Sequence, residues 1–483
     1  MDAEQIRLLE PKLDDFLEHF AECFARRDTR EHLLVYVRGQ LSDLREKSVE
    51  PIALNSGVAP RTLQEFLSQL SWDHDKMRDR LQQLVAIQHA GPHRIGIFDE
   101  TSDPKKGTKT PGVQKQWCGR LGKVENCMVT VHLGFAQDDF HCLLDGELFL
   151  PESWAEDRQR CREAGIPDTM TYRPKWEIAL EQYDRAIRNG VSFDWLTFDE
   201  GYGSKPELLR QLTQRRQNFV AEVPKSVMGW LKPPRVLTRP YHGAGGGRPR
   251  QTPRLASDSP KARRLDEWLK HQQLKDQPWQ RFRVKDGEKG PQVWECKKAM
   301  LTVKDEQGLP GARLHLLIAR HVLDQGEFKF FLSNAAEETS AGKLLLVALS
   351  RWRVERCFQD QKSEIGLDQY EGRRYIGLKR HLVLSMVSYL FLAQMRQEWG
   401  KKSGPDRVPT AHCSGGIDPF LVDDGCISER SVGGESSQED HKGATTHRRG
   451  SQEPHQDNHR QTPRGRHILN PNRPVLLELD LAL

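Results

Sequence analysis

The sequence lacks closely spaced cysteines, although it contains nine of them. The nearest two, Cys118 and Cys127, are too far apart for the CxxC pattern of zinc sites and redox-active disulfides. An odd number of scattered cysteines favours reduced thiols in the cytosol over a secreted, disulfide-bonded framework. The pattern argues against a secreted protein and against a zinc ribbon.

Long apolar segments are also missing. The longest uncharged apolar run, residues 382–393, has 12 residues, whereas a membrane-spanning helix needs about 20. The first residues, MDAEQIRLLEPKLDD, contain acids where a signal peptide would need positive charge. We therefore expect no membrane partner and a cytoplasmic location.

The chain is long and rich in charged residues. Its 483 residues correspond to about two to four domains at roughly 150 residues each. Charged residues make up 29% of the chain and the mean hydropathy is −0.71, which predicts some solvated chain beside a folded core. The net charge of +5 does not show where the basic residues lie, so it identifies no partner.

Residues 1–90 are predicted to be helical, because apolar residues recur at intervals of three and four. Within them, Gly57 marks a turn and Pro60 suits the first position of a further helix. Two helices joined by a glycine turn are compatible with a DNA-binding helix-turn-helix. An ordinary αα-hairpin fits the same pattern equally well.

Residues 91–224 are predicted to form an α/β sheet, since three strand-like runs are followed by alternating helices and strands. Residues 225–340 are β-rich, and residues 341–400 are helical. Within the β-rich part, residues 232–264 hold nine Lys/Arg against one acid, with six Pro and four Gly, which indicates an exposed basic loop. Residues 401–483 form a polar tail in which 428–467 hold only two apolar residues, too few to order the segment.

Two predicted strands each end in an acid. Asp99 closes HRIGIFDE and Asp199 closes FDWLTFDE, and the carboxyl ends of strands in an open α/β sheet are where sites form. Each Asp is followed by a Glu, but neighbouring strand residues point to opposite faces, so only one of each pair can face a given site. The two acids are therefore predicted to converge.

A predicted helix, RWRVERCFQDQKSEIG, supplies a third acid. It spaces Arg351, Glu355, Phe358 and Lys362 by four, three and four residues, which places them on one stripe. Three carboxylates from two strands and a helix are enough to hold two Mg²⁺ ions about 3.5–4 Å apart for phosphoryl transfer. Arg351 and Lys362 would then contact DNA phosphates or orient Glu355.

Ordinary structural roles explain each of these residues taken singly. A strand-terminal Asp is commonly a turn or N-cap residue, and Arg351 with Glu355 is commonly a surface ion pair. Lys105 and Lys106, before Gly107, fit a solvated loop as well as a loop that binds a DNA strand beside the site. Spacing alone leaves these alternatives open.

The segment from Asp99 to His381 resembles the DDE transposases of bacterial insertion sequences, in the group with a Tyr-Arg-Glu-Lys signature around the third acid. Asp99-Glu100-Thr101 matches the first acid's context, Asp199 to Gly203 the D-x-G-Y-G context of the second, and Arg351, Glu355 and Lys362 the signature. The signature Tyr falls at Ala348 and is missing. The likeness covers roughly residues 30–398, including the amino-terminal GVAPRTLQEFL.

This resemblance implies an α/β, RNase H-like catalytic core (91–224 and 341–400) with a β-rich insertion domain (225–340), preceded by an all-α DNA-binding region (1–90). It implies catalysis and metal binding by Asp99, Asp199 and Glu355, with two Mg²⁺ ions that Mn²⁺ can replace. The DNA contacts it implies are Lys105, Lys106, Arg351, Lys362 and, in the basic insertion loop, Arg248 and Arg250. A solvated linker is the alternative for that loop.

The implied activity is cleavage at the element's ends and strand transfer into target DNA. The partners would be terminal inverted repeats, target DNA and a second copy of the chain, in the bacterial cytoplasm at the nucleoid. Two alternatives remain: an inactive DNA-binding remnant of a transposase, favoured by Ala348 and the tail, and a structure-selective RNase H-like endonuclease. The tail at 401–483 is expected to be foreign to the fold.

Overall fold

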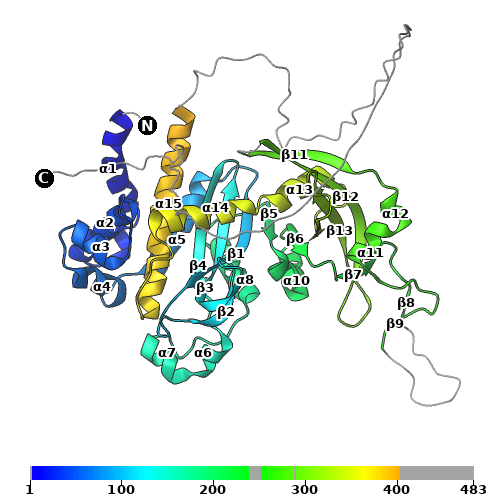
Figure 1. Ribbon diagram of the computed structural model, residues 1–483, viewed down its shortest axis with the longest axis horizontal. Helices are drawn as coiled ribbons and strands as arrows, with labels where there is room; N and C mark the ends of the chain where they lie inside the picture. Colours follow the sequence, from blue (N-terminus) through cyan, green and yellow to red (C-terminus); the bar gives the residue numbers. More distant parts are fainter. Residues whose placement is uncertain (1–2, 239–251, 288–289, 403–483) are drawn as a thin grey trace, which may run out of the picture.

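The computed structural model describes residues 3–238, 252–287 and 290–402 (Figure 1). Its first part is helical because apolar side chains at intervals of three and four, such as Leu13, Phe16 and Phe20, are buried together. Gly57 turns the chain with a φ of +67°, and Pro60 is the first residue of the following helix. The helices here are α1 (Ala3–Glu18), the 3₁₀-helix η1 (Ala21–Cys23), α2 (Arg27–Leu41), α3 (Val49–Asn55), α4 (Pro60–Ser68) and α5 (His74–Gln88).

One large mixed sheet follows, and five of its strands form the centre of the molecule. Their spatial order is β4-β3-β1-β5-β6, in which β5 and β6 run parallel to β1, while β3 is antiparallel to β1 and β4 is antiparallel to β3. A short strand, β2, pairs with the first residues of β3. These strands are β1 (Ile95–Pro104), β2 (Gln114–Cys118), β3 (Lys123–Gln137), β4 (Phe140–Leu148), β5 (Trp195–Phe198) and β6 (Phe219–Val223).

The later β-rich strands continue this sheet. β14 (Phe328–Ser333) pairs antiparallel with β6, and β13 (Pro310–His321) and β12 (Gly290–Lys304) extend the sheet outward from there. The remaining elements of this part are β7 (Met228–Trp230), β8 (Val236–Leu237), β9 (Arg254–Leu255), β10 (Arg263–Arg264), α11 (Leu265–Lys270), α12 (Gln272–Lys275) and β11 (Gln280–Gly287). The middle of the basic loop, with Arg248 and Arg250, lies outside the described residues.

Helices cover the central strands on both faces. On one face lies α14 (Trp352–Asp360), whose Val354 approaches Gly134 of β3. On the other face lies α8 (Lys175–Arg188), whose Gln182 donates a hydrogen bond to the Val131 carbonyl of β3. The shorter helices around them are α6 (Glu152–Glu156), α7 (Arg158–Ala164), α9 (Glu200–Gly203), α10 (Pro206–Gln214), α13 (Ala341–Leu349) and the π-helical turn η2 (Gln361–Ile365).

The longest helix, α15 (Tyr375–Lys402), joins the amino-terminal helices to the sheet (Figure 1). By length and composition it could cross a membrane, but 83% of its most apolar window is buried inside the protein, as in a core helix. Its His381 bonds to Tyr36 of α2, and its Ser385 accepts a hydrogen bond from Gln40. From residue 403 on, the tail lies outside the described residues.

Candidate catalytic site

Asp99 lies on β1, and Asp199 directly follows β5, the neighbouring parallel strand. Phe98 of β1 is in register with Phe198 of β5, so the residues that follow each Phe are adjacent across a strand spacing of about 4.8 Å. The expectation that Asp99 ends its strand is wrong. The strand continues to Pro104, because β3 pairs with it as far as Pro104 opposite Cys127, whereas β5 ends at Phe198.

Burial dominates the electrostatics of Asp99, which is 8% exposed. Burial raises the pKa of its carboxyl group to about 7, the Arg351 guanidinium opposes that rise, and the Asp199 carboxylate adds to it. The Arg351 Nη1 donates to Asp99 Oδ2 at 3.3 Å, and the Glu100 amide donates to Oδ1 at 2.8 Å. The Asp99 carboxylate is thus held in a fixed orientation under helix α14.

Asp199 caps the short helix α9, as its Oδ1 accepts a hydrogen bond from the Tyr202 amide at 3.3 Å. Burial raises the pKa of Asp199, and the nearby Glu100 carboxylate raises it further. Glycine is required sterically at position 203, because a Cβ there would overlap the Glu222 carbonyl oxygen of β6. An N-cap role and a functional role therefore coexist at Asp199.

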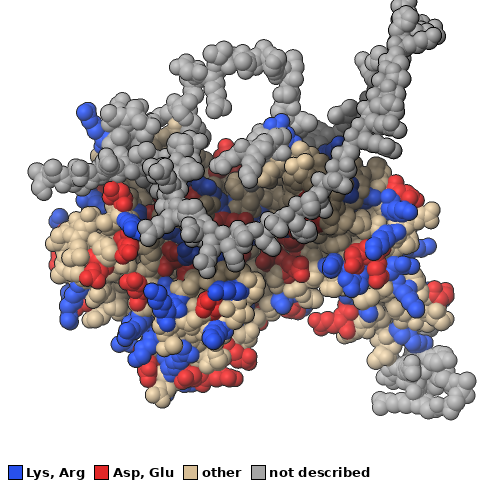
Figure 2. Space-filling model, in the orientation of Figure 1, with Lys and Arg blue, Asp and Glu red and all other residues tan. Residues whose placement is uncertain are grey.

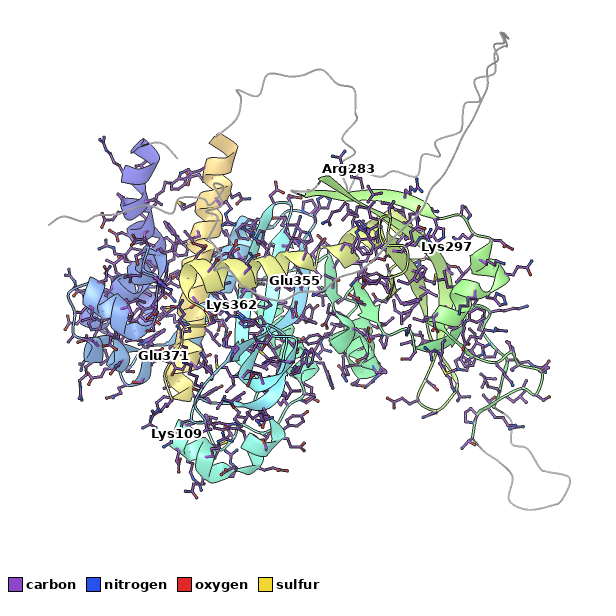
Figure 3. All side chains as sticks on the ribbon, in the orientation of Figure 1. Lys109, Arg283, Lys297, Glu355, Lys362 and Glu371 are labelled. Atoms are coloured by element: carbon purple, nitrogen blue, oxygen red, sulfur yellow. The ribbon has the colours of Figure 1, made fainter. Side chains whose placement is uncertain are left out.

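Glu355 of α14 is linked to Asp99 through Arg351. It lies in the first turn of that helix, and its Oε1 is 2.8 Å from Nη1 of Arg351, the same nitrogen that contacts Asp99. The Glu355 side chain is 54% exposed, so it is the accessible member of the group. Figure 3 shows Glu355 on α14, above the central strands. Arg351 thereby connects a strand acid to the helix acid.

Lys362 lies beyond the end of α14, and its side chain contacts the same face of β1 as Arg351 does. Residues 361–365 form a π-helical turn that directly follows α14. Its Nζ donates to Thr101 Oγ1 at 2.6 Å and lies 3.3 Å from Asp103 Oδ1. Because strand residues alternate, Asp99, Thr101 and Asp103 share one face of β1. Lys362 therefore binds that face beyond Asp99, toward the end of the strand.

The remaining residues singled out in the sequence have different positions. Lys105 is half-buried and donates to the Asp368 and Tyr370 carbonyls, at 3.1 and 2.8 Å, rather than facing solvent. Lys106 is exposed. Ala348, at the position of the signature Tyr, is buried in α13.

Two residues near the acids were missed by sequence reasoning. Tyr202 donates a hydrogen bond to Glu100 Oε2 at 3.2 Å, and Lys175 of α8 forms an ion pair with Glu100. Glu100 thus bonds to groups on the α8 side of the sheet, opposite the face that Asp99 presents to α14. Tyr202 lies within the glycine motif after Asp199, which is the signal that could have found it; Lys175 has no comparable signal.

The donor chemistry at this site suits a hard divalent cation. All three acids offer carboxylate oxygens, which Mg²⁺ and Mn²⁺ accept. Within the described ranges no group of three or more His, Cys, Asp and Glu side chains is close enough together to hold a metal ion. The Arg351 guanidinium occupies the space between Asp99 and Glu355, so a positive group already lies where a cation would bind.

Comparison with known proteins identifies the family. The model of a family described as DDE superfamily endonuclease matches residues 19–291, more than half of the chain. The chain belongs to the DDE superfamily endonucleases. Asp99 and Asp199 fall inside the matched range of this family, whereas Glu355 lies beyond it. The resemblance to DDE transposases is thereby confirmed.

A curated relative of this DDE endonuclease has also been described as a transposase. The chain is 30% identical over 215 residues to a "probable transposase for insertion sequence element IS701" of Microchaete diplosiphon. This match covers 44% of the chain and 53% of the relative. The chain thus spans about half the length of the curated relative it matches. Among solved structures, the NurA nuclease from Sulfolobus solfataricus matches 69% of this chain and 95% of its own at 9% identity, with a TM-score of 0.22.

Proposed function

We propose that this DDE endonuclease is an insertion-sequence transposase that cuts DNA at the ends of its element and joins them to target DNA. The observation that carries the proposal is the register of Phe98 with Phe198, which brings Asp99 and Asp199 together below the helix of Glu355. The identity with a probable transposase supports the same activity. Its partners would be the terminal inverted repeats, target DNA and a second copy of the chain, in the bacterial cytoplasm.

The strand order β4-β3-β1-β5-β6 supports an RNase H-like core. Three antiparallel strands come first in the sequence, and two further strands parallel to the first extend the sheet on its other side, with helices between them. In this arrangement the first acid lies on the central strand and the second follows the adjacent parallel strand. Both acids follow the point where the parallel pairing of β1 with β5 ends, and sites in such sheets form where parallel strands end.

We assign Asp99, Asp199 and Glu355 as the ligands of two divalent ions, Mg²⁺ or Mn²⁺. When bound, the ions would activate the attacking oxygen and stabilise the leaving oxygen of a phosphodiester. The protein's contribution is to fix Asp99 through the Glu100 amide and to present the exposed Glu355 from the rigid first turn of α14. Arg351 would release Glu355 and contact a DNA phosphate, to which its planar donors are suited.

The amino-terminal helices are assigned to DNA binding through α3, the turn at Gly57 and α4. Leu63, Phe66 and Leu67 fix α4 by packing into the core, and Arg61 remains exposed at its start. Because α15 packs against α2, α4 and α5, binding at these helices would be rigidly connected to the sheet that bears the acids.

The test supplies DNA carrying the element's ends, with and without Mg²⁺, to the full chain. We expect cutting that requires Mg²⁺ and is lost in Asp99→Ala and Glu355→Gln. Glu364→Gln is the matched control, because Glu364 lies on the adjoining helical turn and its side chain is not part of the site. Cutting that survives both site substitutions would reject the assignment.

Other outcomes identify the alternatives. Binding of the ends without any cutting by the wild type would mark an inactive remnant. Cutting that depends on DNA structure but not on the presence of element ends would mark a structure-selective endonuclease. In both cases the transposase proposal fails.

A further inference from the structure

A groove lies between the end of β1, the segment before α15 and the amino-terminal helices. It consists of two adjoining hollows of about 800 and 610 Å³ that share Thr108, Lys109 and Arg373 in their walls. We call this feature the 104–110 groove, after the loop that both hollows touch. The other walls come from residues 368–374, from α7 and, in the larger hollow, from Glu46 and Ser48.

The 104–110 groove contains basic side chains that are not part of an ion pair. Lys106, Lys109, Arg373 and Arg374 line it, all four are exposed, and within the described part of the chain none forms an ion pair. Figure 2 shows Lys and Arg side chains gathered over this side of the molecule, with acidic side chains among them.

Several of the acids in the groove are already committed to bonds of their own. Asp368 pairs with Arg120 at 2.5 Å, and the Asp157 carboxylate caps α7. Glu46, Glu163 and Glu371 also line the groove, so the four cations exceed these remaining acids by one. An anionic ligand would find partners there that the fold does not use.

The walls of the groove are fixed by bonds within the protein. The Lys105 ammonium group, on the loop, donates hydrogen bonds to the carbonyls of Asp368 and Tyr370. Arg160 of α7 donates to the Thr108 carbonyl at 2.9 Å, while its guanidinium stacks 3.7 Å from the centroid of the buried Trp154 ring. The groove is thus built before any ligand arrives, which lowers the ordering cost of binding.

The groove starts close to the acids. Pro104, in its wall, is five residues beyond Asp99 on the same strand, which is about 16 Å at roughly 3.3 Å per residue. A DNA duplex advances about 3.4 Å per base pair, so this separation corresponds to about five base pairs. Figure 3 shows Lys109 and Glu371 on the same side of Lys362, away from Glu355.

We infer that the 104–110 groove binds the DNA backbone about five base pairs from the phosphate that is cut. Lys106, Lys109, Arg373 and Arg374 would contact its phosphates. This inference rests on the proposed function, because it takes the scissile phosphate to lie at Asp99 and Asp199. Since Glu46 and Ser48 belong to the amino-terminal region, DNA held here would touch both that region and the core.

The test measures binding of a fluorescent 30-base-pair duplex to the full chain by anisotropy, in EDTA and over a range of salt concentrations. Each phosphate contact contributes about 0.9 to the slope of log affinity against log salt. Lys106→Gln/Lys109→Gln and Arg373→Gln/Arg374→Gln should each reduce that slope by about 1.8, and should weaken binding at 0.15 M salt by about tenfold or more. Thermal unfolding should not change, because the four side chains are exposed.

The matched control is Arg188→Gln/Arg216→Gln. It removes the same charge from two exposed residues that precede β5 and β6, at the opposite end of the strands from Asp199. A control effect equal to that of the groove variants would overturn the inference, since bulk charge alone would then explain it. If the groove variants keep the wild-type slope while cutting still requires Glu355, the inference fails and the proposed function stands. If they lower the slope while the wild type cuts no end-bearing DNA, the proposed function fails instead.

Discussion

Replacing Asp99 with Asn should stabilise the metal-free protein while removing its activity. Burial and Asp199 raise the pKa of Asp99 to about 7, from an ordinary value of about 3.8. A carboxyl group whose pKa is higher in the folded state favours folding only while it is protonated. Its stabilising effect is complete below pH 3.8 and is lost as the pH rises to 7. Asn cannot ionise, so the variant avoids that loss.

The size of the effect follows from the shift in pKa. One pKa unit corresponds to about 1.4 kcal/mol, so the titration of Asp99 lowers the free energy of unfolding by up to about 4 kcal/mol at pH 8. At pH 5, where this group ionises only in the unfolded chain, the reduction is about 2 kcal/mol. The Asn oxygen can still accept the Glu100 amide hydrogen bond, and Arg351 keeps Glu355 as its partner. Urea denaturation in EDTA at the two pH values measures both differences.

Asp324→Asn is the control for this experiment, because Asp324 is exposed and the same atoms are exchanged. It should change stability by less than about 0.5 kcal/mol at either pH. An Asp99→Asn protein that is less stable than the wild type at pH 8, or that gains equally at pH 5 and pH 8, would refute the reasoning. Saturating Mg²⁺ should reduce the difference, since only the wild type retains all three proposed ligands.

Two further predictions concern the scaffold around the site. Burial lowers the pKa of His381 to about 4, so the folded protein holds it neutral, and stability should fall as the pH drops from about 6.5 toward 4. Urea denaturation measures how much stability the protein loses between pH 7 and pH 5. This loss should be about 2 kcal/mol smaller in His381→Asn than in the wild type, and an unchanged loss would contradict the assignment. In Gly203→Ala the added methyl group meets the Glu222 carbonyl, so the midpoint of thermal unfolding should fall by several degrees. Gly107→Ala is the control: its added methyl group has open space, so the midpoint should not change.

Much of the site's composition could be predicted from sequence because it depends on local patterns. Apolar runs ending in an acid mark Asp99 and Asp199, and the spacing within one helix marks Arg351 and Glu355. The register that places Asp99 beside Asp199 is a tertiary property, since it depends on how β5 aligns with β1. The alternation of helix and strand predicts an α/β sheet, but no local signal gives the alignment of two strands to within one residue.

The contacts of Lys362 depend on the tertiary structure, which residue spacing does not describe. A π-helical turn follows α14 at residues 361–365, and no pattern in the sequence predicts it. The turn lets one continuous segment serve two points on β1, with Arg351 at Asp99 and Lys362 at Thr101 and Asp103. Lys362 therefore lies between the acids and the 104–110 groove, so a DNA strand that spans both would pass over the segment that Lys362 ties to β1.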